Sequence, residues 1–155
     1  MGSGKSAVGV IVAHRAHTPF FDLDLMIEKA AGTSVSRIFA TRGEAEFRAL
    51  ESQVLPAALR EGAVAALGGG TVMDDANWKL INERAVTIYL ELPFDSLWER
   101  IEGSADRPLL AGRTRAEVAE IFERRRPRYE EATHRVAAAR PPGQLAGEIL
   151  ALWRD

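Results

Sequence analysis

Apolar residues along the chain fall into short continuous runs and into longer segments with helical spacing. The clearest helical stripe joins Phe47, Leu50, Val54 and Leu55, at positions i, i+3, i+7 and i+8. Further helices are predicted over 5–16 and 25–31, around 97–101, after Thr114 and through Leu145, Ile149 and Trp153. Short strands are predicted at 19–21, 63–67, 85–92 and 134–136.

Polar and turn-forming residues mark the ends of these segments. Asp95 or Ser96 is predicted to cap the helix around 97–101, and Thr114 with Glu117 forms a capping box for the next one. Pro56 is expected to end or kink the long helix near Leu55.

The run at 63–67 is apolar on both faces, as in parallel strands that are covered by helices on each side. Helices and strands also alternate along the chain, which predicts an α/β fold. The length of 155 residues is that of a single compact domain, so one domain over 1–155 is expected.

Composition narrows the function classes. The net charge of −2 leaves no basic footprint for nucleic acid. The absence of cysteine excludes disulfides and thiolate chemistry. No apolar run reaches the roughly 20 residues of a membrane span, and no secretory signal is recognisable. We therefore expect a cytoplasmic protein without a membrane or nucleic-acid partner.

A phosphate-binding turn is predicted at Gly2-Ser3-Gly4-Lys5-Ser6, directly before the first helix. A glycine-rich turn followed by Lys and Ser points backbone N–H groups and the positive end of a helix at a phosphate. An ordinary solvated turn is one alternative, and N-myristoylation of Gly2 is another.

Two other candidate ligand-binding segments follow predicted strands, an acidic one and a glycine-rich one. Asp22 and Asp24 stand where open α/β sheets bind ligands, and beside a phosphate Asp22 would support magnesium while Asp24 accepts a proton. They could equally cap the next helix. The triple glycine at 68–70 lets a ligand approach the backbone.

Three further segments carry charge. Arg48 and Glu51 lie one turn apart beside the apolar stripe, where a solvated ion pair is the usual outcome. The basic run at 124–128 has the character of exposed surface. The polar break at about 102–115, with Arg107 inside it, is predicted to be a mobile lid.

Several of these motifs, in this order, resemble the shikimate kinase family. They are the phosphate turn, Asp22-Leu23-Asp24, the segment 43–51, the triple glycine, Arg107-Pro108-Leu109-Leu110 and Arg125-x-Pro127-x-Tyr129. The resemblance implies a P-loop kinase fold with a five-stranded parallel sheet and a lid. It also implies magnesium-dependent transfer of phosphate from ATP to the 3-hydroxyl of shikimate, on the route to aromatic amino acids.

The resemblance also implies roles for single residues. Lys5, Asp24 and Arg107 would be catalytic. Shikimate would be bound by Asp24, Arg48, Gly69, Gly70 and Arg125, and magnesium by Ser6 and Asp22. ATP would be bound by Gly2, Ser3, Gly4, Lys5, Ser6, Ala7, Arg100 and Arg107.

The chain departs from the family pattern at its start. The first glycine of the phosphate loop and the strand before it are expected to be missing, and Met1 to be a misassigned start. That strand would lie in the middle of the sheet, so its neighbours are expected to face each other across a gap. Two alternatives to an active kinase stay open: a related binding module without catalysis, and a kinase for another small alcohol. A monomer is expected.

Overall fold

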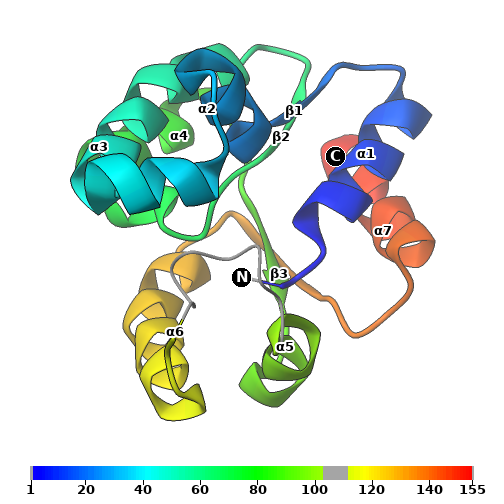
Figure 1. Cartoon of the computed structure of the whole chain (residues 1–155). Helices are drawn as coiled ribbons and strands as arrows, with labels where there is room; N and C mark the ends of the chain where they lie inside the picture. The colour runs from blue at the N-terminus through cyan, green and yellow to red at the C-terminus, as the bar shows by residue number, and fades with distance from the viewer. Residues whose placement is uncertain (1, 103–111, 155) are drawn as a thin grey trace.

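The computed structural model describes residues 2–102 and 112–154, in which helices and strands alternate (Figure 1). In chain order they are α1 (Lys5–Ala16), β1 (Phe20–Asp22), α2 (Leu23–Ala31), α3 (Val35–Ala58), β2 (Val64–Ala66), the 3-10 turn η1 (Thr71–Met73), α4 (Asp75–Arg84), β3 (Ile88–Glu91), α5 (Phe94–Ile101), α6 (Arg115–Glu130), β4 (His134–Ala137) and α7 (Pro142–Arg154). The predicted α/β class is confirmed.

The strands form two separate parallel pairs. In one, β1 pairs with β2, with Phe21 opposite Ala65. In the other, β3 pairs with β4, with Leu90 opposite Val136. Among the described residues no strand links β2 to β3, so the sheet is divided in its middle. The gap that the family pattern predicts is therefore present.

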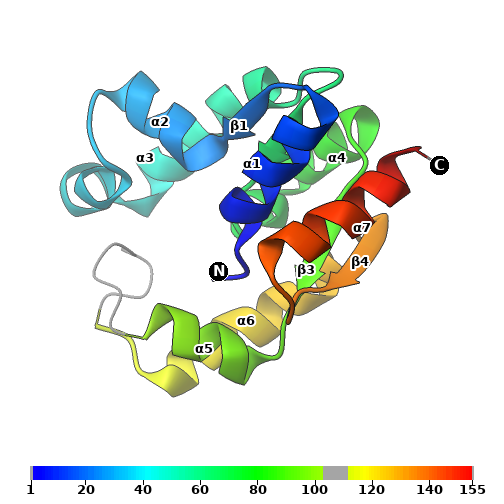
Figure 2. The same ribbon diagram turned by 90° about the vertical axis from the view of Figure 1, so that its right-hand side faces the viewer.

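The buried apolar residues form two clusters, one for each pair of strands. The first cluster joins α1 and α7 to β3, β4, α5 and α6, with Val12, Leu97 and Leu145 in its interior. The second joins α2, α3 and α4, with Ile27, Leu55 and Ile81 at its centre. In Figure 1 the α2–α4 group and the α5–α6 pair project on different sides of the strands, and Figure 2 shows α1 beside α7.

The predicted helix ends are confirmed in part. The Thr114–Glu117 capping box forms in full at the start of α6. The prediction that Asp95 or Ser96 caps α5 is wrong, because that helix begins at Phe94, directly after Pro93, and has no side-chain cap. Pro93 is the N-cap residue, with an extended ψ of 145°, and the N–H that it lacks would have no helical acceptor at this end.

The long helix α3 contains a break at Gly43, whose φ of 81° and ψ of 172° are not helical. The helix after this break carries the predicted apolar stripe. It continues through Pro56 to Ala58 rather than ending near Leu55.

The closing helix α7 buries Leu145 and Ile149 as predicted, but Trp153 is 44% exposed near the end of the chain. The apolar stripe therefore ends one turn early. None of the helices in the described part of the chain combines the length and apolar character needed to cross a bilayer.

Candidate active site

The start of α1 has the geometry of a phosphate-binding turn. Gly4 is the N-cap residue, in the left-handed region with φ 85° and ψ 18°, and it makes no side-chain cap. The N–H groups of Lys5, Ser6 and Ala7 therefore lie in the first turn, where no helical carbonyl accepts from them. Such N–H groups and the helix dipole attract an anion.

Asp22 joins this turn to the neighbouring helix. The Ser6 hydroxyl donates to Asp22 Oδ2 at 2.5 Å. The other oxygen, Oδ1, accepts from the backbone N–H groups of Asp24 at 3.1 Å and Leu25 at 3.5 Å, which caps α2. Asp22 therefore caps α2, as one of its two interpretations predicted, and it also accepts a hydrogen bond from the phosphate turn.

Asp24 lies in the first turn of α2 and faces the glycine turn that follows β2. A Cβ atom placed on Gly68 would be 3.7 Å from Asp24 Oδ1 and 3.1 Å from Glu51 Oε1. Both carboxylates thus pack against the bare backbone of Gly68. A side chain at this position would crowd Glu51 and make ordinary contact with Asp24.

Arg48 is held by a buried carboxylate. Its Nη1 donates to Glu51 Oε2 at 2.7 Å, and Thr71 Oγ1 donates to Glu51 Oε1 at 2.6 Å. Glu51 is 1% exposed, so the prediction of a solvated pair is wrong. Its oxygens are satisfied inside the fold instead. The guanidinium of Arg48 also lies against Gly70, where any Cβ would overlap it.

Tyr129 brings α6 to the same glycine turn. Its hydroxyl donates to the Gly69 carbonyl at 2.7 Å. Burial raises the pKa of the Tyr129 phenol, while a hydrogen bond from Arg125 and the charges of Arg125 and Arg48 act to lower it. Arg48 lies against Gly70, and Arg125 is beside the hydroxyl that binds Gly69, so both arginines lie near the glycine turn.

Further contacts fix this end of α6 against α4. Trp78 Nε1 donates to Glu131 Oε2 at 2.9 Å. Arg128 forms an ion pair with Asp75 and stacks over the Trp78 ring, 5.6 Å from its centroid. The basic run is therefore not simply exposed surface, because Arg128 is engaged with α4.

The sequence analysis missed the roles of Glu51 and Tyr129. Tyr129 follows Arg125 by four residues, so a helix places both on one face, and this spacing was the available signal. Nothing local marks Glu51, because its burial comes from η1, which is distant in the sequence.

Two predicted site residues remain, Arg100 and Arg107. Arg100 lies beside the phosphate turn, with its Nη1 donating to the Gly2 carbonyl at 3.4 Å. Arg107 and most of the predicted lid at 102–115 lie outside the described residues.

The side chains at the phosphate turn fit one class of metal. Ser6 and Asp22 offer a hydroxyl and a carboxylate oxygen, the ligands that Mg²⁺ takes alongside phosphate oxygens and water. No group of three or more His, Cys, Asp or Glu side chains gathers in residues 2–102 and 112–154, so an all-protein metal cage is not formed there.

Comparison with known proteins points to one family. The model of the shikimate kinase family matches residues 1–153. The shikimate kinase of Salinibacter ruber is 41% identical over 161 residues, covering 97% of this chain and 79% of its own. That of Aquifex aeolicus is 36% identical, covering 97% and 89%.

Solved structures agree. Shikimate kinase from Acinetobacter baumannii in complex with shikimate superposes with a TM-score of 0.95 at 30% identity, over 99% of this chain and 88% of that one. The Aquifex aeolicus structure has a TM-score of 0.88 at 35% identity, over 99% and 92%. These matches show that the chain belongs to the shikimate kinase family.

Proposed function

We propose that this chain transfers the γ-phosphoryl group of ATP to the 3-hydroxyl of shikimate, within one cleft bounded by the phosphate turn, α2 and the glycine turn at 68–70. The observation that carries the proposal is the convergence of Arg48 and Arg125 at Tyr129, beside Gly69. This pairing suits a compact carboxylic acid, which supports shikimate rather than another small alcohol.

The acid would be held by the two guanidiniums. Arg48 and Arg125 come from different helices, and each can donate two parallel hydrogen bonds to a carboxylate. Glu51 would keep Arg48 oriented through Nη1 at 2.7 Å, while Nη2 donates to the exposed Glu44 at 3.3 Å and would exchange this partner for the acid. The backbone of Gly69 and Gly70 would then lie against the ring, where no side chain intervenes.

Asp24 would meet the hydroxyl that reacts. In the transfer, the hydroxyl oxygen bonds to the γ-phosphorus, the bond from that phosphorus to the β,γ-bridging oxygen breaks, and ADP leaves with its electron pair. Asp24 would orient the hydroxyl and accept its proton.

The nucleotide phosphates would lie over the start of α1. The N–H groups from Lys5 to Ala7, the ammonium of Lys5, and the turn Gly2-Ser3-Gly4 would surround them. Magnesium would be held by Ser6 and, through water, by Asp22, and when bound it would neutralise phosphate charge. Arg100 would contact the adenine side and Arg107 the phosphates. We also propose a monomer with a single domain and a lid at about 102–115.

The test is a coupled assay that monitors the release of ADP with shikimate as the acceptor. Lys5→Met is expected to lower kcat by at least about a hundredfold, because one phosphate-neutralising donor is lost. Lys79→Met is the matched control, since Lys79 forms a loose surface pair with Glu83 at 3.7 Å and should leave kcat unchanged. Binding of shikimate by the parent chain without turnover would instead identify a binding module.

A further inference from the structure

A network of side-chain hydrogen bonds runs from the interior of the fold to Arg48. Asn77 Nδ2 donates to the Thr71 carbonyl at 3.3 Å, and Thr71 Oγ1 donates to Glu51 Oε1 at 2.6 Å. The other carboxylate oxygen, Glu51 Oε2, accepts from Arg48 Nη1 at 2.7 Å. We call these four residues the Glu51 network. It joins α4 and η1 to the guanidinium that the proposed function assigns to the acid.

The interior members of the Glu51 network are closed to water. Thr71 is 0% exposed, Glu51 1% and Asn77 5%, and they are the buried polar residues of the described ranges 2–102 and 112–154. A buried carboxylate keeps its charge only where donors surround it. Because water does not reach Glu51, the Thr71 hydroxyl serves Oε1 and Arg48 serves Oε2.

The position of the Thr71 hydroxyl is set by the glycine turn and by the side chain itself. The Thr71 N–H donates to the Gly68 carbonyl at 3.1 Å, and η1 begins directly after the triple glycine. A Cβ on Gly68 would lie 3.0 Å from Thr71 Oγ1 and 3.1 Å from Glu51 Oε1, so this bare backbone leaves room for their contact. The branched Cβ of threonine also restricts its χ1 angle. Thr71 therefore presents its hydroxyl to Glu51 in a restricted orientation.

This contact limits how Glu51 holds Arg48. A carboxylate with both oxygens available can take an arginine through two parallel hydrogen bonds. With Oε1 engaged by Thr71, Glu51 meets the guanidinium through Oε2 and Nη1. Arg48 Nη2 reaches the exposed Glu44 at 3.3 Å instead, and a surface ion pair of this kind is weak enough for a ligand to replace. One edge of the guanidinium thus stays available.

We propose that Thr71 is a positioning residue for acid binding: its hydroxyl holds Glu51 to a single-oxygen contact, which leaves Arg48 Nη2 for the substrate carboxylate. The inference deepens the proposed function and rests on it. Loss of the hydroxyl would let Glu51 turn both oxygens toward Arg48, which weakens the binding of shikimate and leaves the phosphate turn as it is.

The experiment compares Thr71→Val, which keeps the branched shape without the hydroxyl, with Thr71→Ser, which keeps the hydroxyl. Thr71→Val is expected to raise the KM for shikimate about tenfold, the effect of one hydrogen bond to a charged group, with kcat and the KM for ATP unchanged. Thr71→Ser should bring the KM for shikimate back to within about threefold of the parent. If Thr71→Val does not fold, Thr71→Cys replaces it, because a thiol is only a weak donor.

A second background tests whether Thr71 acts through Arg48. Arg48→Lys replaces the planar guanidinium by a single ammonium nitrogen, which cannot form two parallel bonds with one carboxylate. Adding Thr71→Val to Arg48→Lys should therefore change the KM for shikimate by less than about twofold. A rise as large as in the parent background would overturn the proposal.

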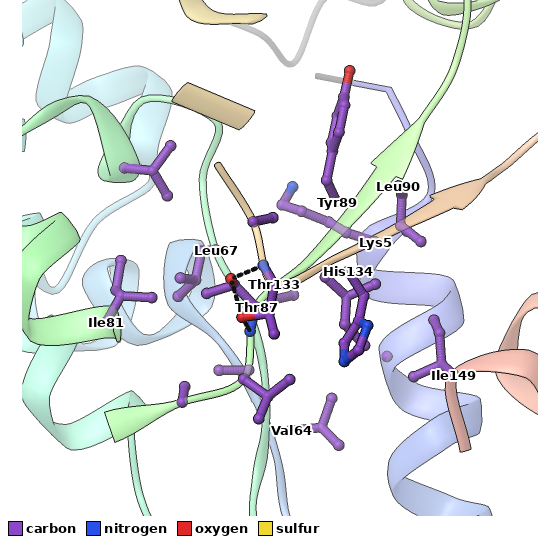
Figure 3. A pocket seen from close by; sticks show the side chains of 18 of the residues that line it. Lys5, Val64, Leu67, Ile81, Thr87, Tyr89, Leu90, Thr133, His134 and Ile149 are labelled. Atoms are coloured by element: carbon purple, nitrogen blue, oxygen red, sulfur yellow. Dashed lines mark hydrogen bonds between the residues drawn. The ribbon is translucent and has the colours of Figure 1, made fainter. Parts of the chain in front are cut away.

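Thr133→Val is the matched control. The hydroxyls of Thr133 and Thr87 pair at 3.1 Å beside the cavity of about 630 Å³ that β2 and β3 line (Figure 3). This variant also exchanges a hydroxyl for a methyl group, but its hydrogen bonds go to Thr87 and not to the Glu51 network. Both KM values should stay at the parental level. A rise in the KM for shikimate equal to that of Thr71→Val would mean general loosening and overturn the proposal.

A measurement without turnover separates this inference from the proposed function. The side-chain NMR signals of Arg48, assigned by comparison with Arg48→Lys and recorded without substrate, should shift in Thr71→Val and not in Thr133→Val. If the parent chain shows no turnover with shikimate, the proposed function fails, and these signals alone decide whether Thr71 sets the contact of Glu51 with Arg48. Unchanged Arg48 signals, a parental KM for shikimate in Thr71→Val, or equal rises in both KM values would overturn the positioning role.

Discussion

At the scale of single residues, the Tyr129 hydroxyl donates to the Gly69 carbonyl at 2.7 Å and accepts a hydrogen bond from Arg125. Tyr129→Phe keeps the ring and removes this donor. A hydrogen bond contributes about 0.5–1.5 kcal/mol, so we expect the KM for shikimate to rise roughly three- to tenfold while the KM for ATP stays constant. Steady-state kinetics with each substrate varied in turn measures this split.

The control uses the neighbouring tyrosine. Tyr89 packs on Tyr129 with ring centroids 5.5 Å apart, but Gly69 receives its bond from Tyr129 alone among the described residues. Tyr89→Phe should leave both KM values unchanged. An equal rise in the two KM values for Tyr129→Phe would show general loosening of the fold and contradict the positioning role.

Gly70 offers a second residue-scale prediction. Its φ of −92° and ψ of −21° suit any residue, yet a Cβ there would overlap the Arg48 guanidinium. Gly70→Ala should displace Arg48 from the buried Glu51 carboxylate and lower the free energy of unfolding by about 1–3 kcal/mol, the cost of leaving a buried polar group short of a partner. The KM for shikimate should rise about tenfold, as expected when a charge-assisted bond weakens.

The matched control is Gly147→Ala in α7, where the added Cβ would lie 3.9 Å from Arg15, in ordinary contact. It should leave the kinetics unchanged. If Gly70→Ala keeps the parental KM for shikimate, Arg48 does not contact the acid in the way proposed.

At the scale of elements, the break in α3 depends on Gly43. In this backbone conformation a residue with a side chain lowers the free energy of unfolding by about 1–3 kcal/mol, although the space around Gly43 is open. Gly43→Ala is therefore expected to lower the free energy of unfolding by that amount in urea titrations. Ala49→Gly, on the exposed side of the same helix, should cost about 0.5–1 kcal/mol. A neutral or stabilising Gly43→Ala would show that α3 can straighten.

The helices and strands also show which parts of the fold could be predicted from the sequence. Local signals were sufficient for α1, the Thr114 capping box and the four strands, because caps and apolar runs act within a few residues. They failed for Glu51, whose burial depends on Thr71, and for Trp153, whose exposure depends on where neighbouring elements end. The phosphate turn was predicted from its local motif and the paired arginines by resemblance to a family, whereas the contact of Tyr129 with Gly69 required the fold.

At the scale of the whole molecule, stability should depend on pH in the alkaline range. Burial, followed by Glu91 and other nearby groups, raises the pKa of Tyr89 from 10.0 to about 12, and burial also raises that of Tyr129. Between pH 10 and about 12 the folded chain therefore keeps protons that the unfolded chain has lost. Stability is complete below pH 10 and falls as pH rises through this window.

Urea titrations at intervals from pH 9 to about 12 measure the slope of the free energy of unfolding against pH. Tyr89→Phe should flatten it, because one of the two groups no longer titrates. A slope that is unchanged in Tyr89→Phe would assign the alkaline loss of stability to other groups.

Asp22 uses one carboxylate on two neighbouring helices, with Oδ2 on Ser6 of α1 and Oδ1 on the first turn of α2. Any shift of the phosphate turn must therefore pull on the helix that carries Asp24. Binding of a nucleotide at the phosphate turn would therefore also shift the start of α2, where the proposed acceptor hydroxyl lies. One side chain, Asp22, would couple the two halves of the proposed cleft.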